Sequence, residues 1–356
     1  MYLLFFIFAS LLSLLYFNKK QSKIILYILG IFLILFAGTR NSDVSSDYDA
    51  YEFMFSSAVN NIADYFYDFS ITELSVFIIP QFAHSILISE VDYVRLSFII
   101  FALIGVSTKL KVLSNSDYFF WGMMIYLSNL YLGQEMITIR AGVASGIFLL
   151  SIKDIVNKND KAFFIKMGFA FLFHYTSILF ILIWALIKFR ISLKNYLWGL
   201  VISLFIAFNN INILSLLLIN RIFPKVNIYL ESAGIEGNDT INVFNFRIIF
   251  ALLITLFFLF SYKKYKDNNY FEVLFKIHVF SLIVFFALSS INKVFSLRSY
   301  ELLSVIQLLL YPMILQIFQQ KFKIIGYFVI LAYCIFSFYY FLEITTLFNP
   351  YNSWLI

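Results

Sequence analysis

The sequence has little of what a soluble or disulfide-stabilised protein needs. Only one cysteine, Cys334, occurs in 356 residues, which excludes a disulfide framework. Proline and glycine are scarce, at 4 and 12 residues. Charged residues make up 13% of the chain, whereas soluble domains carry about 25%. The chain therefore does not have the composition of a soluble globular protein.

Recognisable cofactor and metal motifs are also lacking. The sequence has no internal repeat, no phosphate-binding glycine loop, no dinucleotide fingerprint and no Cys/His cluster. We therefore expect no cofactor and no metal ion. The net charge of +6 is spread over short loops and does not indicate a nucleic-acid partner. The first apolar segment lacks a basic leader and a small-residue cleavage site, so we expect no cleavable signal peptide.

Long apolar runs dominate what is present. Hydrophobic residues make up 62% of the chain, and the mean hydropathy is +0.88. We therefore predict an all-α polytopic membrane protein, one integral membrane domain over residues 1–356 with about 11–13 membrane helices or half-helices. Its larger outer loops are expected at about 40–70 and 220–242. The apolar segments lie at about 2–17, 24–39, 71–89, 93–108, 118–133, 136–152, 162–173, 176–189, 195–218, 243–261, 270–290, 300–318 and 324–342.

Lysines predict the orientation, because positively charged loops stay on the cytoplasmic side. They cluster in six short loops, one of which holds Lys109 and Lys111. If all six are cytoplasmic, residues 162–189 form a helical hairpin that turns outside near His174. Residues 71–108 then make one net crossing, with 71–89 dipping in and returning near Pro80. In the alternative, 71–89 crosses fully and some lysine loops break the rule.

Arginines show the opposite distribution. On this topology six of the seven lie at outer helix ends or in outer loops, and Arg190 alone lies inside. A planar guanidinium binds phosphate or carboxylate at two points, so the outer face is predicted to bind an anionic ligand. In the simpler alternative these arginines anchor at the interface or pair with nearby acids. The outer six are Arg40, Arg95, Arg140, Arg221, Arg247 and Arg298.

The stretch "GTRNSDVSSDYDAY" places Arg40 and three aspartates directly after an uncharged run. In a helix, Asp47 and Tyr51 share one face, with Tyr48 beside them. A carboxylate and tyrosine rings suit sugar recognition. The alternative is a merely solvated acidic loop.

The stretch "QEMITIRAGVASG" puts Arg140 one turn inside a helix. A charge at that depth is costly unless paired, so it is a candidate for function. Glu135 is the partner expected on structural grounds alone. The small residues after Arg140 allow another helix or a lipid chain to approach closely.

Three further sites complete the candidates. His174 lies in an apolar run, where histidine is usually structural, but an outer turn would make it available for proton transfer. Arg298 and Glu301 are spaced i, i+3 and suit either a salt bridge or a ligand. The loop "NRIFPKVNIYLESAGIEGNDTIN", residues 220–242, begins at Arg221 and is a candidate lid.

Together these motifs resemble the EpsG family of Wzy-type polysaccharide polymerases. The family pattern has an arginine followed by Asp-Tyr and Tyr, with Ser46 here replacing the usual glycine. It continues with Ile-Arg and small residues, then Phe-His-x-Ser/Thr, then an arginine near the last helices. The matching positions are Arg40, Asp47, Tyr48, Tyr51, Ile139, Arg140, Gly142, Ala144, Phe173, His174, Thr176 and Arg298.

The resemblance implies a type-C glycosyltransferase-like bundle that needs no metal. The implied donor is a glycan on undecaprenyl diphosphate, and the acceptor is a lipid-linked repeat unit of O-antigen, capsule or exopolysaccharide. We expect Arg140 and Arg298, supported by Arg40, to bind diphosphates. Either Asp47 or His174 is the base. The remaining substrate-binding candidates are Tyr48, Tyr51, Glu135, Arg221, Arg247 and Glu301.

We expect the active site to face the outside of a bacterial inner membrane, with a chain-length regulator as a candidate partner protein. Two other classes stay open. A flippase for the same lipid-linked units would need charges buried within several helices. A membrane O-acetyltransferase would need a route for a cytoplasmic acyl donor. An O-antigen ligase has similar chemistry, and the sequence alone does not distinguish it from a polymerase.

Overall fold

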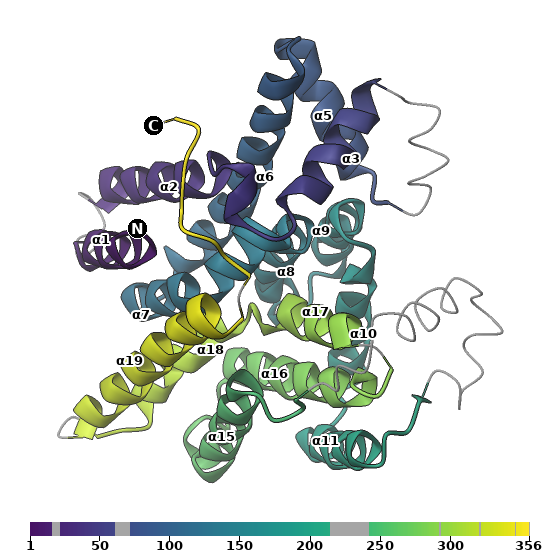
Figure 1. Cartoon of the computed structure of the whole chain (residues 1–356). Helices are drawn as coiled ribbons and strands as arrows, with labels where there is room; N and C mark the ends of the chain where they lie inside the picture. Colours follow the sequence, from purple (N-terminus) through teal and green to yellow (C-terminus); the bar gives the residue numbers. More distant parts are fainter. Residues whose placement is uncertain are drawn as a thin grey trace. The chain divides into compact units, whose positions relative to one another are not determined.

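The computed structural model describes residues 1–15, 22–60, 72–213, 242–291, 293–319, 322–345 and 347–355 (Figure 1). Within these ranges the regular structure is helical, and the only extended pairings are two isolated β-bridges. Each of the thirteen apolar segments contains a helix. The prediction of an all-α polytopic membrane protein is thus confirmed.

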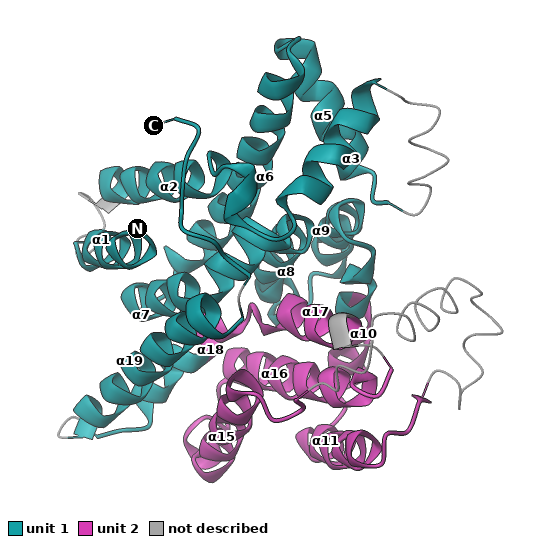
Figure 2. Ribbon diagram, in the orientation of Figure 1, with its two compact units in different colours: residues 1–180, 311–356 teal, residues 181–310 magenta. Residues whose placement is uncertain are grey.

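The chain divides into two compact units, residues 1–180 with 311–356, and residues 181–310 (Figure 2). The prediction of one membrane domain stays a prediction. The first unit contains α1 (Tyr2–Leu14), α2 (Ser22–Gly38), α3 (Tyr48–Asn60), α5 (Ser75–Ile86), α6 (Glu90–Leu113), α7 (Phe119–Ile125), α8 (Ile139–Val156), α9 (Asp160–Phe173) and α19 (Lys323–Tyr339).

Several short helical turns complete this unit. Three have the wide π-helical pitch: Tyr126–Leu130, Leu132–Ile137 and Tyr340–Ile344. Three are 3-10 turns: Ser42–Val44, Tyr175–Ser177 and Tyr311–Gln316.

The second unit begins within α10 (Ile178–Lys188). It continues with α11 (Leu193–Phe208), α15 (Phe246–Phe260), the 3-10 turn Tyr262–Lys264, α16 (Asn269–Leu288), α17 (Lys293–Ser304) and α18 (Gln307–Leu310). Helices α11 and α16 pack closely here, because a Cβ added to Gly199 would lie 3.1 Å from Cδ1 of Ile283.

Three described helices are long and apolar enough to cross a membrane alone: Glu90–Leu113, Asn269–Leu288 and Lys323–Ile344. A fourth span is available if the pair Phe295–Ser304 and Gln307–Gln316, bent by 40°, crosses as one. Seven more apolar helices of the described chain have 10–17 residues. Since about 20 residues are needed to cross, these shorter helices are half-spans or cross a locally thinned bilayer.

Two glycines show how α2 and α6 run. The α-carbon of Gly38 faces Ile99, and that of Gly30 faces Leu110, so that an added Cβ would lie 2.9 Å and 3.2 Å from those residues. The two helices are therefore antiparallel. The segment between them consequently starts and ends on the same side, which supports the predicted single net crossing by residues 71–108.

The predicted return near Pro80 is wrong. Pro80 lies inside α5, which continues to Ile86, and the chain turns only at residues 87–89 before α6. Pro80 has no backbone N–H to donate, yet it is buried in the interior of this helix, and the helix does not end there. At 1.5 Å per residue, the 12 residues of α5 span about 18 Å, too short to cross the bilayer alone.

Candidate functional site

Glu73 is the point where three distant parts of the first unit meet. Its Oε1 lies 2.8 Å from Nδ1 of His174, and its Oε2 forms an ion pair with Nη1 of Arg140. Arg140 also reaches Tyr51, with its Nε 3.4 Å from the tyrosine oxygen and its guanidinium 5.3 Å from the ring centroid. We call Tyr51, Glu73, Arg140 and His174 the Glu73 centre.

A break between α9 and α10 delivers His174 to this centre. Helix α9 ends at Phe173, and His174 is extended, with φ −156° and ψ 117°. The backbone N–H of Tyr175 then donates to Glu73 Oε1 at 3.3 Å, and its hydroxyl donates to the carbonyl of Thr72 at 2.9 Å. The helices are thus interrupted at the position where the hairpin turn was expected, and the break docks onto residues 72–73. The hairpin itself and its outer side stay a prediction.

The charge of Glu73 fixes the state of its neighbours. Burial by itself would raise the pKa of this carboxyl group, but the hydrogen bond from His174 and the charge of Arg140 outweigh it and lower the pKa to about 2. An ionised carboxylate only accepts hydrogen bonds. Nδ1 of His174 therefore donates the hydrogen of this contact, and Nε2 is the ring nitrogen that Glu73 does not engage.

This centre remains in reach of a ligand. The side chain of Arg140 is 19% exposed and that of His174 is 16% exposed, whereas Glu73 is only 6% exposed. Within the described ranges no protein partner is found for Nη2 of Arg140 or Nε2 of His174. A buried carboxylate thus holds two accessible nitrogen groups in place.

The tyrosines of α3 are buried rather than presented on the surface. Tyr48 and Tyr51 are each 4% exposed. Tyr48 stacks on Phe98, with ring centroids 4.2 Å apart, and Tyr51 meets the same ring edge-on at 6.4 Å. Asp47 directly precedes α3, and the backbone N–H of Tyr51 donates to its carbonyl at 3.2 Å. A sugar-binding face that Asp47 shares with Tyr51 stays a prediction. The Ser46 hydroxyl lies 3.3 Å from the Asp47 carboxylate.

Arg40 belongs to the same aromatic cluster but lies deeper. It is 1% exposed, and its guanidinium lies 4.9 Å from the ring centroid of Phe98 and 5.4 Å from that of Tyr48. It donates to the Ala37 carbonyl at 2.5 Å and to the Ser45 hydroxyl at 3.2 Å, whereas its Nη2 has no hydrogen-bond partner in the described chain. Burial lowers the pKa of Arg40 to about 10, so it is still a cation at neutral pH.

The C-terminal residues 347–355, which we call the strap, hold the segment around Arg40. Antiparallel bridges join Arg40 to Ser353 and Ser45 to Phe348. The backbone N–H of Trp354 donates to the Thr39 carbonyl at 3.1 Å, and the indole ring of Trp354 lies 4.6 Å from the guanidinium of Arg95. The strap therefore fixes residues 39–46 from the far end of the chain.

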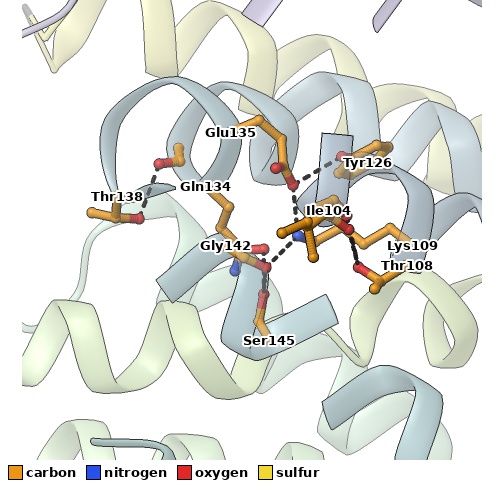
Figure 3. Close-up of polar contacts among 11 residues, drawn as sticks. Ile104, Thr108, Lys109, Tyr126, Gln134, Glu135, Thr138, Gly142 and Ser145 are labelled. Atoms are coloured by element: carbon orange, nitrogen blue, oxygen red, sulfur yellow. Dashed lines mark hydrogen bonds and ion pairs between the residues drawn. The ribbon is translucent and has the colours of Figure 1, made fainter. Parts of the chain in front are cut away.

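A second charged pair is buried between α6 and the segment that leads into α8 (Figure 3). Nζ of Lys109 donates to Oε1 of Glu135 at 2.6 Å and to the Gly142 carbonyl at 2.7 Å. The Tyr126 hydroxyl donates to the same Glu135 oxygen at 2.9 Å. Lys109 is 0% and Glu135 1% exposed.

This pair corrects two predictions. Glu135 does not pair with Arg140, because the π-helical turn that carries it directs its carboxylate towards α6, and Glu73 neutralises Arg140 instead. Lys109 does not lie in a cytoplasmic loop, because α6 continues to Leu113 and buries it. It is therefore no evidence of sidedness. The small residues after Arg140 do admit a close neighbour, since the Gln134 carbonyl would lie 2.1 Å from a Cβ on Gly142.

The remaining arginine candidates lie in the second unit or outside the described residues. Nη1 of Arg247 donates to Oε1 of Glu301 at 2.7 Å, with the side chains 10% and 19% exposed. Arg298 is exposed on α17. Arg221 and the candidate lid at 220–242, apart from Asn242, are outside the described residues.

Sequence reasoning missed Glu73 and Phe98. Phe98 is one of 46 phenylalanines, and nothing in the sequence distinguishes it. Glu73 carries a weak signal, because it is an acid directly before an apolar helix. Among the described residues, no group of three His, Cys, Asp or Glu side chains could hold a metal ion.

Comparison with known proteins gives one match. The model of the EpsG family matches residues 23–353, nearly the whole chain. No curated protein and no solved structure matches. The match includes the Glu73 centre, the Lys109–Glu135 pair and most of the strap.

Proposed function

The chain belongs to the EpsG family, which is related to Wzy-type polymerases, and we propose that it polymerises lipid-linked oligosaccharide repeat units. In this proposal it is a metal-independent glycosyltransferase. It moves a glycan from undecaprenyl diphosphate onto the terminal sugar of a second lipid-linked unit. The product is an O-antigen, capsule or exopolysaccharide chain.

The observation that carries the proposal is the convergence of His174 and Arg140 on one carboxylate. They lie 101 and 67 residues from Glu73 in the chain, yet both contact it. A carboxylate that orients a histidine is the arrangement by which enzymes activate hydroxyl groups. The arginine beside it supplies a positive charge for an anionic leaving group.

His174 is the base in this mechanism. Its Nδ1–H is held by Glu73, so Nε2 accepts the proton of the acceptor hydroxyl as that oxygen attacks the anomeric carbon of the donor glycan. A new carbon–oxygen bond forms there, and the bond from the same carbon to the diphosphate oxygen breaks. We assign Asp47, the other candidate, to binding sugar hydroxyls.

The leaving undecaprenyl diphosphate carries the charge that Arg140 stabilises. Glu73 and Tyr51 hold Nη1 and Nε of Arg140, and no hydrogen bond of its Nη2 is found within the described residues. Arg298 remains a proposed second phosphate contact, as do Arg221, Arg247 and Glu301 for other parts of the substrate. Arg40 is buried, so we assign it to fixing Tyr48 and Phe98 rather than to direct ligand contact.

The proposed site faces the outside of the bacterial inner membrane. The remaining lysine loops still support this orientation. Single cysteines at Asn60, Tyr175, Asn159 and Asp267, in a Cys334→Ala background, test it. An impermeant thiol reagent should label only the first two in intact cells. Labelling at 159 or 267 would reverse the orientation.

A flippase is the second candidate, because the Lys109–Glu135 pair is buried charge within helices, as a transport pathway would require. A deletion strain separates the two. Loss of a polymerase leaves single repeat units on the surface, whereas loss of a flippase leaves none. We expect single units, and an empty surface with lipid-linked units accumulating inside would favour the flippase.

Complementation of that strain tests the site. His174→Ala should leave single units with little ladder, whereas Asp47→Asn should retain a weaker ladder. A full ladder with His174→Ala would remove His174 as the base. Coexpression with a chain-length regulator, the proposed partner protein, should narrow the distribution of chain lengths in the ladder. His174→Ala should still be less active than Asp47→Asn.

A further inference from the structure

The two hydrogen-bond partners of Lys109, Glu135 and Gly142, bracket Arg140 in the sequence. Glu135 lies five residues before Arg140, and Gly142 lies two residues after it. A single amine, Nζ of Lys109, contacts both flanks, at 2.6 Å and 2.7 Å (Figure 3). The segment that carries Arg140 is thus held to α6 on both sides.

The pair is a poor device for stability alone. Burying two charges costs several kcal/mol per ion, and a well-packed apolar pair of similar size is often as stable or more so. The chain has apolar side chains in abundance at neighbouring positions. What an ion pair adds is direction, because the amine must meet both the carboxylate and the carbonyl at hydrogen-bond distance.

We propose that the Lys109–Glu135 pair is a positioning device that sets Arg140 in the Glu73 centre. The inference rests on the proposed function, because Arg140 is there the group that stabilises the diphosphate. Neither Lys109 nor Glu135 contacts substrate in this proposal. They act by fixing the first turn of α8.

The local backbone explains why such a device is needed. Residues Leu132–Ile137 form a wide π-helical turn, closed by the Thr138 N–H on the Gly133 carbonyl at 2.8 Å, and α8 begins at the next residue. A wide turn directly before Arg140 leaves the helix start poorly defined unless it is tied to a neighbour. Lys109 supplies that tie from α6.

Additional contacts close the same turn onto α8. The Ser145 hydroxyl lies 2.9 Å from Oε1 of Gln134 and 2.8 Å from the Gly142 carbonyl. On the α6 side, Gly105 makes room for Glu135, since a Cβ there would lie 2.1 Å from Oε2. Helix α6 also carries Phe98, which packs against Tyr51. Helix α6 therefore supports the backbone around Arg140 through Lys109, and the Arg140 side chain through Phe98 and Tyr51.

The test uses the double variant Lys109→Met/Glu135→Gln, which leaves no unpaired charge. Lys166→Met is the matched control, because Lys166 forms a more exposed ion pair with Asp154 in the same unit. We expect the double variant to reach the membrane at normal levels and to lose at least tenfold in polymerisation rate. The Lys166→Met variant should behave as the wild type.

Two further readouts separate positioning from general stability. Hydrogen exchange of the purified protein should speed up in residues 133–142 of the double variant and not elsewhere. The acid limb of its polymerisation profile should move to higher pH, because Glu73 loses part of the Arg140 charge. Normal exchange in 133–142 together with a normal rate would overturn the proposal. So would a lower rate with an unshifted profile and exchange raised throughout the protein.

Gly105→Ala gives a second route if the double variant does not accumulate. It displaces the Glu135 carboxylate without removing a charge, and Gly168→Ala, where an added Cβ meets nothing within 4 Å, is its control. Faster exchange in 133–142 for Gly105→Ala alone supports the proposal, and equal exchange in both variants overturns it. Since exchange needs no substrate, this result stands even if the wild type shows no polymerase activity.

Discussion

Nδ1 of His174 lies 2.8 Å from Oε1 of Glu73, across 101 residues of chain. The carboxylate also pairs with Arg140 through its other oxygen. One buried acid thereby fixes the proton of an imidazole and the place of a guanidinium. The proposed chemistry depends on both.

Glu73→Gln should therefore lower the polymerisation rate strongly while the protein still reaches the membrane. An amide can donate to Nδ1 and so stabilise the wrong tautomer, and it does not balance Arg140. Loss of oriented base catalysis is worth about 10²-fold or more. The rate is measured with lipid-linked repeat units in detergent. Glu343→Gln, at an exposed acid of the same unit, is the control, and an equal rate in both variants would exclude Glu73 from the site.

The same carboxylate makes stability depend on acid pH. Its pKa falls from 4.5 to about 2 on folding, so its stabilising effect is complete above about 4.5 and is lost as the pH falls towards 2. At about 1.4 kcal/mol per unit, the effect is about 3 kcal/mol. The melting temperature of the wild type should fall between pH 5 and pH 3 more steeply than that of Glu73→Gln. Parallel curves would show that Glu73 is not ionised in this pairing.

Arg140→Lys should lose most polymerisation, on the order of tenfold or more. A lysine ammonium can pair with Glu73, but it cannot also hold Tyr51 and offer a second planar donor to a phosphate. The surface ladder and the amount of protein in the membrane are compared with those of Arg190→Lys, at the arginine predicted to lie on the cytoplasmic side. A normal ladder with Arg140→Lys would mean that Arg140 acts only as a point charge.

Much of the fold was predictable, because apolar runs of this length have few outcomes other than membrane helices. The break at His174 was predictable for a similar reason, since lysines mark both ends of residues 162–189. The position of Lys109 was not. A lysine at the end of an apolar run usually marks a loop, but here α6 runs five residues further, and the partner acid comes from a π-helical turn that no pattern reveals.

The site was only half predictable. Arg140 and His174 stand out as polar residues in apolar surroundings, and each was identified alone. Their common partner was missed, because a contact across 67 or 101 residues leaves no trace in local spacing. The burial of Arg40 was also missed, since it depends on a strap from the opposite end of the chain.

Close packing next to Arg140 predicts that alanine at Gly142 lowers the stability of the protein, whereas alanine at Gly168 does not. Gly142→Ala should destabilise the protein by about 1–3 kcal/mol, because the added methyl group would lie 2.1 Å from the Gln134 carbonyl. Gly168→Ala should be neutral or stabilising by up to about 1 kcal/mol, since it improves helix propensity in open space. Melting temperatures of the two purified variants decide this. A tolerated Gly142→Ala would contradict the close approach of the π-helical turn to α8.

The most direct test of the account uses purified protein and one lipid-linked repeat unit in detergent, without other enzymes. The wild type should build a ladder and release one undecaprenyl diphosphate for each glycosidic bond formed. His174→Ala should do neither above background, while Asp47→Asn should retain a measurable rate. A wild-type protein that binds the substrate but yields neither ladder nor free diphosphate, or an equally active His174→Ala, would contradict the account.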